Sequence, residues 1–394
     1  MLHRIRPATI LGNPSDAVGD QTDHRESRMD WDALIRDEVK PLVPYAPGLR
    51  TSEVRERSGR DEIIKLSSNE NPYGPFPTAI AAMEAVLPRL NRYPDGAARA
   101  LRGRLAEKLG VDAENVSLSA GSNELLRLIA EVLIQPGDEV VFAWPSFIVY
   151  PAVTQMFGGT AVRVPLASGE VHDLEAMAEA VTDKTKLVFL CNPNNPTGTY
   201  YGNSALDVFL ERIPAGVPVV VDEAYFEYVT AGDYPSGLDY FHPEGRIVVL
   251  RTFSKIYSLA GTRVGYGIVP TALARAIDQV REPFNVSSVG QVGAYYSLAD
   301  EAEVERRRRE NQEQKTYLYS CFDRLGIGYV PSETNFVYVK TKKPVEVFEA
   351  LLAEGIIVRD FGSAPALRVG VGTPAEVRAT CEAFEAVAAK LGQL

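Results

Sequence analysis

The chain has 394 residues, 45% of them hydrophobic and 24% charged, and 52 acidic side chains against 41 basic ones give a net charge of −11. This composition is typical of a globular protein with a buried core, and it excludes collagen-like, disulfide-scaffold and disordered chains. The acidic balance disfavours nucleic acid and anionic membranes as partners, because either would require an excess of lysine and arginine. The length favours two domains.

The cysteines and histidines are few and scattered: they are Cys191, Cys321, Cys381, His3, His24, His172 and His242. No CxxC pair and no ligand spacing occurs among them, so we expect neither a disulfide framework nor a metal site. A Ser-His-Asp triad is disfavoured for the same reason. Reduced cysteines favour a cytoplasmic location.

The N-terminal region lacks the patterns of regular structure. Residues 1–29 are polar, contain Gly and Pro and show no periodicity, which predicts a flexible extension with Met29 as a candidate for the true start. Residues 30–65 are expected to form an arm with a helix. No segment reaches the ~18 consecutive apolar residues of a membrane span, so no membrane partner is expected.

Short apolar runs alternate with helical patterns over residues 66–280, which predicts an α/β domain with a mostly parallel central sheet flanked by helices. The expected strands are 116–119, 139–143, 161–165, 186–190, 217–221 and 247–250, and 124–134 is an expected helix.

The pattern changes in residues 281–394, where we expect a smaller α+β domain. A long charged helix is predicted over about 301–325, followed by strands near 334–340, 356–359 and 367–371 and by a closing helix from Pro374. The run ERRRRENQEQ from Glu305 is interpreted as a solvated helix face and not as a nucleic-acid patch, because the whole chain is acidic.

Polar residues follow the expected strands at the edge where open α/β sheets place their sites. They are Ser122 and Asn123, Asn195, Asp222 and Tyr225, and Thr252, Ser254, Lys255 and Arg263. Each alone has an ordinary explanation, such as a helix cap, a turn or a surface charge. Together they match the needs of pyridoxal 5′-phosphate: a lysine for a Schiff base, a carboxylate for the ring nitrogen, hydrogen bonds to the ring hydroxyl, and a cationic cradle for the phosphate.

The motifs NPNNPTGT, VDEAY and TFSKIYSLAGTRVGY resemble those of fold-type-I aminotransferases of the class I/II group, and within that group the histidinol-phosphate aminotransferase family. The resemblance runs from about Asp30 to the C-terminus. It implies that Lys255 is the Schiff-base lysine and proton-transfer base and that Asp222 pairs with the pyridine nitrogen. Asn195 and Tyr225 would bind the ring hydroxyl.

The resemblance also assigns the cofactor phosphate and the stacking face. Ser254, Arg263 and the amides of Ser122 and Asn123 would hold the phosphate, with Thr252 as a weaker candidate. Phe147, in AWPSFIVY, would stack on the ring.

Further positions are implied for the substrate and for a second subunit. Arg368, in ALRVGVGT, corresponds to the arginine that binds the substrate carboxylate, and Arg359, in GIIVRD, to one directed at a substrate phosphate. Tyr45, in VPYAPG, resembles a substrate-pocket tyrosine. Tyr93, in NRYPDG, resembles the tyrosine that reaches the phosphate in the neighbouring subunit, which implies a homodimer.

The implied reaction is transfer of an amino group from L-histidinol phosphate to 2-oxoglutarate, which yields imidazole acetol phosphate and glutamate in histidine biosynthesis. Aromatic amino acids as donors, and decarboxylation of threonine phosphate, are alternatives on the same scaffold. A cofactor-binding regulatory module is a third, but residues 1–59 are too short and acidic for the DNA-binding domain that it would need.

Overall fold

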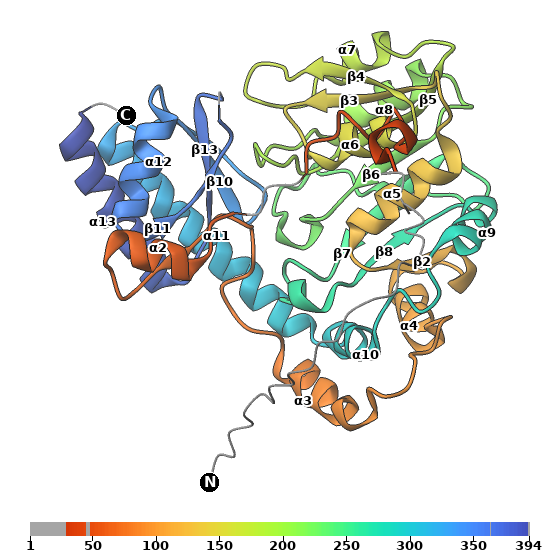
Figure 1. Cartoon of the computed structure of the whole chain (residues 1–394), viewed down its shortest axis with the longest axis horizontal. Helices are drawn as coiled ribbons and strands as arrows, with labels where there is room; N and C mark the ends of the chain where they lie inside the picture. The colour runs from red at the N-terminus through yellow and green to blue at the C-terminus, as the bar shows by residue number, and fades with distance from the viewer. Residues whose placement is uncertain (1–28, 45–47, 363, 393–394) are drawn as a thin grey trace, which may run out of the picture.

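The computed structural model of the chain describes residues 29–44, 48–362 and 364–392, so most of the expected N-terminal extension lies outside the described residues. Figure 1 shows a large unit built on a seven-stranded sheet beside a smaller unit at the C-terminal end of the chain. None of the helices in the described part of the chain is both long and apolar enough to cross a membrane.

The large sheet has the strand order β2-β8-β7-β6-β5-β3-β4. Its strands are β2 (Val116–Ser119), β3 (Glu139–Trp144), β4 (Thr160–Pro165), β5 (Thr185–Cys191), β6 (Val219–Asp222), β7 (Ile247–Thr252) and β8 (Gly265–Ile268). All neighbouring pairs are parallel except the two that β8 makes. The expected mostly parallel α/β fold is therefore confirmed.

Helices cover both faces of this sheet. They are α3 (Pro77–Val86), α4 (Arg99–Leu109), α5 (Ser122–Leu133), α6 (Val149–Met156), α7 (Leu174–Glu179), α8 (Asn203–Arg212), α9 (Thr271–Val280) and α10 (Ser288–Ser297). Alternate residues of one strand enter opposite cores: Val219 and Val221 of β6 pack in one cluster and Val220 in the other. Burial on both faces explains why the central strands β3, β5, β6 and β7 contain unbroken apolar runs.

β8 was not expected from the sequence, because two of its four residues, Gly265 and Gly267, have low strand propensity. A methyl carbon at Gly265 would lie 2.4 Å from the backbone nitrogen of Ser122. Glycine is thus needed where the start of α5 approaches this strand.

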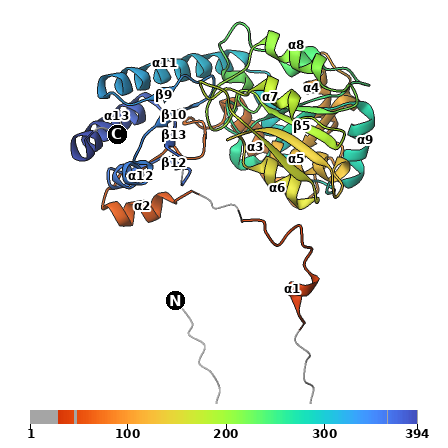
Figure 2. The ribbon, with the colours of Figure 1, turned by 90° about the horizontal axis from the view of Figure 1, so that it is seen from above.

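The small unit contains a four-stranded antiparallel sheet with the order β12-β13-β10-β9. Its strands are β9 (Tyr329–Val330), β10 (Phe336–Lys340), β12 (Arg359–Asp360) and β13 (Ala366–Gly370). The helices α12 (Pro344–Ala353) and α13 (Pro374–Leu391) pack on it, and so does the second half of α11 (Glu301–Leu325). Figure 2 shows α11 extending from the small unit to the large one.

The expected single strand 356–359 is wrong. β11 (Ile356–Ile357) pairs in parallel with β1 (Ile64–Lys65), whereas Arg359 and Asp360 pair with β13. The first two residues of the segment pair with β1 and the last two pair with β13. The segment therefore forms two short strands that are separated by Val358.

The N-terminal arm contacts both units. Its short helix α1 (Trp31–Leu34) is followed by Arg36, whose Nη2 donates to the carbonyl of Met156, at the end of α6, at 2.9 Å. Helix α2 (Thr51–Ser58) packs on the small unit, where Val54 contacts Leu352 and Ile357. We propose that the chain consists of an N-terminal arm and two domains. Helix α10 packs against α3 and α4 of the large unit, which favours a boundary between the two domains nearer to α11 than to residue 281.

The interpretation of ERRRRENQEQ as a solvated face is wrong for one stripe of α11. Arg307, Asn311 and Lys315, spaced four residues apart, are 4%, 8% and 0% exposed. Asn311 and Lys315 donate to the carbonyls of Thr334 and Ser332, so α11 buries polar side chains that hydrogen-bond to the backbone.

Candidate active site

A cavity of about 890 Å³ opens at the carboxyl edge of the large sheet and extends to the small sheet. The predicted site residues that line it are Ser122, Asn123, Phe147, Asn195, Asp222, Tyr225, Thr252, Ser254, Lys255, Arg263, Arg359 and Arg368. Those of the large unit come from distant parts of the chain and meet because parallel strands end at one edge, whereas Arg359 and Arg368 come from the small sheet.

Asp222 is the last residue of β6 and is 2% exposed. Its Oδ2 accepts a hydrogen bond of 2.9 Å from the hydroxyl of Tyr150, whereas no atom of the described residues bonds to its buried Oδ1. Burial raises the pKa of Asp222 to about 6, and the bond from Tyr150 opposes that rise. A carboxylate oxygen without a partner beside a cavity fits a cationic group such as a protonated ring nitrogen.

Lys255 follows β7 and lies near Tyr225. Its Nζ donates to the carbonyl of Asn69 at 3.3 Å and lies 5.5 Å from the centre of the Tyr225 ring. Burial lowers the pKa of the Lys255 ammonium to about 8, and the positive charge of Arg368 acts in the same direction. A fraction of the amine is therefore neutral near pH 7, as a nucleophile or a base requires.

Tyr225 is 3% exposed, and its hydroxyl oxygen accepts a hydrogen bond of 2.8 Å from Nδ2 of Asn69. Burial raises the pKa of this tyrosine, so its hydroxyl keeps a proton that it can donate at neutral pH.

Hydroxyl, guanidinium and helix amide groups converge at the start of α5. Nη2 of Arg263 donates to the carbonyl of Ala120 at 3.2 Å, and Thr252 Oγ1 donates to Ser254 Oγ at 3.0 Å. A methyl carbon at Gly121, whose φ is +85°, would lie 2.4 Å from Arg263 Nη2. The absence of a side chain at Gly121 thus lets the guanidinium approach the helix N-terminus, an arrangement that suits a phosphate.

Phe147 lies between β3 and α6, in the wall of the cavity. Its ring meets that of Tyr150 edge to face, with centroids 5.7 Å apart. Tyr150 therefore contacts both Phe147 and Asp222.

Arg359 and Arg368 are opposite each other on β12 and β13. Nη1 of Arg368 donates to Oδ1 of Asn195 at 2.6 Å and Nη2 donates to the carbonyl of Ser67 at 2.8 Å. Asn195 comes from the large unit, so this bond joins the two units within the cavity wall.

One predicted site residue lies elsewhere. Tyr93 is 82% exposed and stacks on Phe284 with ring centroids 4.6 Å apart, away from the cavity wall. Tyr45 lies outside the described residues. No group of three or more metal-ligating side chains occurs within the described ranges.

Sequence reasoning missed Asn69 and Tyr150. Tyr150 stands three residues after Phe147, a spacing that puts both on one side of a helical turn. Asn69 lies in LSSNENPYGP, a turn-rich segment whose composition does not distinguish a site from a loop.

A model of the family "Aminotransferase class I and II" matches residues 61–384. The chain is 48% identical over 343 residues to the histidinol-phosphate aminotransferase of Moorella thermoacetica, a match that covers 86% of this chain and 89% of that protein. It is 46% identical over 348 residues to histidinol-phosphate aminotransferase 2 of Carboxydothermus hydrogenoformans, over 87% of this chain and 96% of that one.

The crystal structure of histidinol-phosphate aminotransferase from Sinorhizobium meliloti, in complex with pyridoxal-5′-phosphate, is similar with a TM-score of 0.82 and 27% identity. That match covers 91% of this chain and 100% of the other. On the family match and on these relatives, the chain belongs to the class I and II aminotransferases.

Proposed function

We propose that this aminotransferase uses pyridoxal 5′-phosphate to transfer the amino group of L-histidinol phosphate to 2-oxoglutarate, in the cytoplasmic synthesis of histidine. The names of the relatives support this substrate. The observation that carries the proposal is one cavity that is lined both by Lys255 and Asp222 and by the opposed pair Arg359 and Arg368.

The residues fit the cofactor. Lys255 would link to it, Asp222 Oδ1 would face the ring nitrogen, and Asn195 and Tyr225 would bind the ring hydroxyl. Phe147 would cover the ring. Bound pyridoxal phosphate supplies an electron sink that stabilises negative charge at the substrate α-carbon.

We assign the phosphate of the cofactor to the start of α5. Ser122 and Asn123 would offer their backbone amides there, and Ser254 and Arg263 their side chains. Thr252 would act through Ser254, because its hydroxyl already donates to Ser254 Oγ.

The side chains of this protein would divide the proton-transfer work. A neutral Lys255 amine would accept the proton from the substrate α-carbon and would then donate it again, so that the proton moves away from that carbon. The lowered pKa of Lys255 permits both steps near neutral pH. Asp222 is ionised above about pH 6 and keeps a positive charge on the ring nitrogen favourable.

The two arginines would receive two kinds of anion. L-histidinol phosphate carries a phosphate and no carboxylate, whereas glutamate, the amino donor in the reverse half-reaction, carries two carboxylates. We propose that Arg359 binds the phosphate and that Arg368 binds the α-carboxylate of glutamate, because planar guanidinium groups suit bidentate contacts with both. Tyr45 would belong to the same pocket.

One observation favours aromatic amino acids as a second class of donor. Rings surround Arg368: its guanidinium lies 5.2 Å from the centre of Phe336 and 5.8 Å from that of Phe361, and Tyr338 lies 6.2 Å from Phe361. Of these rings Tyr338 and Phe361 line the cavity, where they would accept a phenyl group as well as an imidazole.

Half-reaction spectra test the proposal. Histidinol phosphate, phenylalanine and threonine phosphate are added separately to the protein loaded with cofactor, and the loss of the aldehyde-form absorbance is followed. We expect histidinol phosphate to react with the highest kcat/KM. A preference for phenylalanine would replace the proposed donor, and release of carbon dioxide from threonine phosphate would indicate a decarboxylase.

The covalent link has its own test. Borohydride reduction and peptide mapping should place the cofactor on Lys255, and Lys255→Ala should abolish turnover while the cofactor still binds without a covalent link. An adduct on another lysine would refute the assignment.

We also propose a homodimer in which Tyr93 completes the phosphate site of the partner subunit.

A further inference from the structure

Asn69 combines burial with an uncommon backbone conformation. It is 3% exposed and has a φ of +53°, in the left-handed region that asparagine tolerates better than most residues. Backbone in this region costs free energy, and such residues concentrate at functional sites.

The two polar ends of Asn69 contact the two residues to which we assign chemistry at the cofactor. Its carbonyl accepts hydrogen bonds from Lys255 Nζ at 3.3 Å and from Asn335 Nδ2 at 3.1 Å. Its side-chain Nδ2 donates to the hydroxyl of Tyr225 at 2.8 Å. One residue therefore fixes the distance between the lysine and the tyrosine.

The direction of the bond to Tyr225 has a chemical consequence. An amide nitrogen only donates, so the Tyr225 oxygen is the acceptor and its own proton is directed elsewhere. Tyr225 and Asn69 both line the cavity. We propose that Asn69 is a positioning residue that turns the Tyr225 proton toward the ring oxygen of the cofactor and aligns the Lys255 amine beside it. This inference rests on the cofactor site proposed above.

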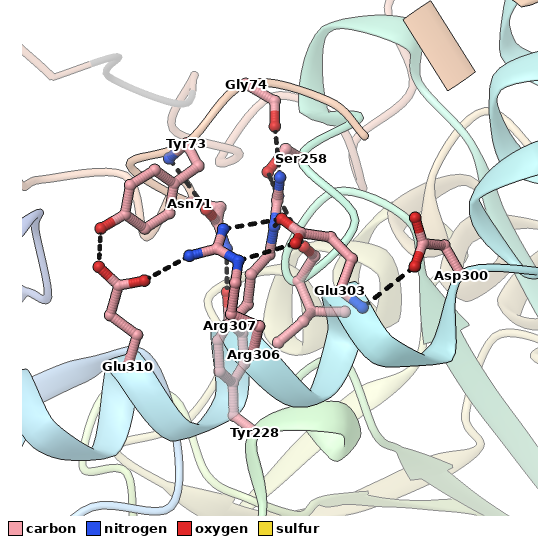
Figure 3. Close-up of polar contacts among 11 residues, drawn as sticks. Asn71, Tyr73, Gly74, Tyr228, Ser258, Asp300, Glu303, Arg306, Arg307 and Glu310 are labelled. Carbon is pink, nitrogen blue, oxygen red and sulfur yellow. Dashed lines mark hydrogen bonds and ion pairs between the residues drawn. The ribbon is translucent and has the colours of Figure 1, made fainter. Parts of the chain in front are cut away.

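The segment after Asn69 is held in place by the large unit and by α11. Nδ2 of Asn71 donates to the Tyr228 hydroxyl at 2.9 Å, and Tyr73 donates to Glu310, which also accepts from Arg306 at 2.7 Å. In Figure 3 Tyr73, Glu310 and Arg306 meet at the upper side of α11, and the Tyr228 side chain extends from below the helix to Asn71.

Arg307, in the buried stripe of α11, connects this segment to the one that follows Lys255. Its Nη2 donates to the carbonyl of Gly74 at 2.7 Å, and its Nη1 donates to the carbonyl of Ile256 at 3.2 Å and to Ser258 (Figure 3). Ser258 also has a positive φ, of 56°. A single guanidinium thus fixes both segments whose contacts meet at Asn69.

Small substitutions at residue 69 separate these roles. Asn69→Asp is nearly isosteric and tolerates a positive φ, but its carboxylate only accepts, so Tyr225 would donate to residue 69 and not to the cofactor. The carboxylate should be ionised, since Lys255 and Arg368 are nearby. Asn69→Gly keeps the backbone conformation and removes the side chain without adding charge. Asn71→Asp is the matched control, because it alters the same kind of bond to a tyrosine that does not line the cavity.

The main readout is the pH midpoint of the visible absorbance of the bound cofactor. A donor on the ring oxygen withdraws negative charge from it, and loss of that donor makes the neighbouring Lys255 nitrogen hold its proton more tightly. We expect Asn69→Asp to raise the midpoint by about one to two pH units, the size of a hydrogen bond to a charged group. Asn69→Gly should raise it less, and Asn71→Asp should leave it unchanged. The charged or ionisable groups around Lys255 and Tyr225 are Glu70, Cys191, Asp222, Arg263 and Arg368, and all variants retain them.

Two further measurements distinguish positioning from a loss of folding. Asn69→Asp should lower kcat about ten- to hundred-fold and change the KM for the amino donor by only a few-fold, on the same hydrogen-bond scale. Its thermal unfolding should stay close to that of Asn71→Asp. An unchanged midpoint in Asn69→Asp, or an equal shift in Asn71→Asp, would overturn the inference. If the unmodified protein forms no titrating absorbance with pyridoxal phosphate, the proposed function itself fails.

Discussion

Arg359 and Arg368 are cross-strand partners in the antiparallel pair of β12 and β13, and both line the cavity. Directly opposed side chains in such a pair have Cβ atoms only about 5 Å apart, and two like charges at this distance are destabilising. An anion near both guanidinium groups would offset this repulsion. A substrate that carries a phosphate or a carboxylate is such an anion.

Replacing Arg359 tests this interpretation. We expect Arg359→Leu to lower kcat/KM for histidinol phosphate about ten- to hundred-fold, the value of a charge-assisted hydrogen bond, and to leave phenylalanine almost unaffected. Arg378→Leu, which removes an exposed charge from α13 of the same unit, is the control. Steady-state kinetics with both donors provide the measurement. Equal losses with the two donors would contradict a phosphate-binding role.

The hydroxyl of Tyr150 is expected to tune Asp222. Tyr150→Phe removes the bond to Oδ2, so the pKa of Asp222 should rise further above about 6 and less carboxylate should be ionised at pH 7. Cofactor affinity, measured by titration of the apoprotein, should fall about ten-fold at pH 7 and recover in part at higher pH. Tyr201→Phe is the matched control, because the buried Tyr201 hydroxyl has no hydrogen-bond partner among the described residues. An equal loss in both variants would indicate general damage to the core.

Gly121 is expected to be essential to the phosphate site. Gly121→Ala adds a carbon 2.4 Å from Arg263 Nη2 and strains a φ of +85°, so cofactor binding should weaken at least ten-fold. Gly137→Ala strains a φ of +96° in open space and so measures the backbone effect alone. Titration of both variant apoproteins with the cofactor measures the two affinities. Comparable affinities would mean that the position of Arg263 does not affect cofactor binding.

Lys255 should make the stability of the apoprotein depend on pH. Its pKa is about 8 in the folded chain against 10.5 in the unfolded one, so between these values the unfolded chain binds more protons and stability rises with pH. Below about pH 8 the full cost of burying the ammonium is present. Lys255→Met should therefore be more stable than the unmodified apoprotein at pH 7, and the difference should shrink as the pH approaches 10.5. Denaturant unfolding of both proteins across this pH range measures the difference in the free energy of unfolding. A difference that stays constant with pH would show that Lys255 does not cause the pH dependence.

The proposed sharing of sites between subunits can be tested by mixing inactive chains. If Tyr93 acts in the partner subunit, hybrids of a Lys255→Ala chain and an impaired Tyr93→Ala chain should regain activity at one of their two sites. Sedimentation and assays of the mixture give the measurement. Mixtures that stay inactive, or a monomer with full activity, would count against the shared site.

The sequence alone was sufficient for six of the seven strands of the large sheet and for the chemical character of the site. The central runs of β5, β6 and β7 (residues 187–190, 219–221 and 247–250) are continuous and apolar because both sheet faces are buried, and Asp222 and Lys255 come soon after two of them. Rules for where parallel strands end and the matched motifs then bring these side chains together.

The tertiary structure decided what depends on contacts between segments distant in the chain. β8 is a strand because glycine admits the start of α5, and Arg307, Asn311 and Lys315 are buried because backbone carbonyls from other elements meet them. The bonds from Tyr150 to Asp222 and from Asn69 to Tyr225 span 72 and 156 residues. Periodicity and propensity describe neighbours along the chain, whereas these contacts depend on how separate elements pack together.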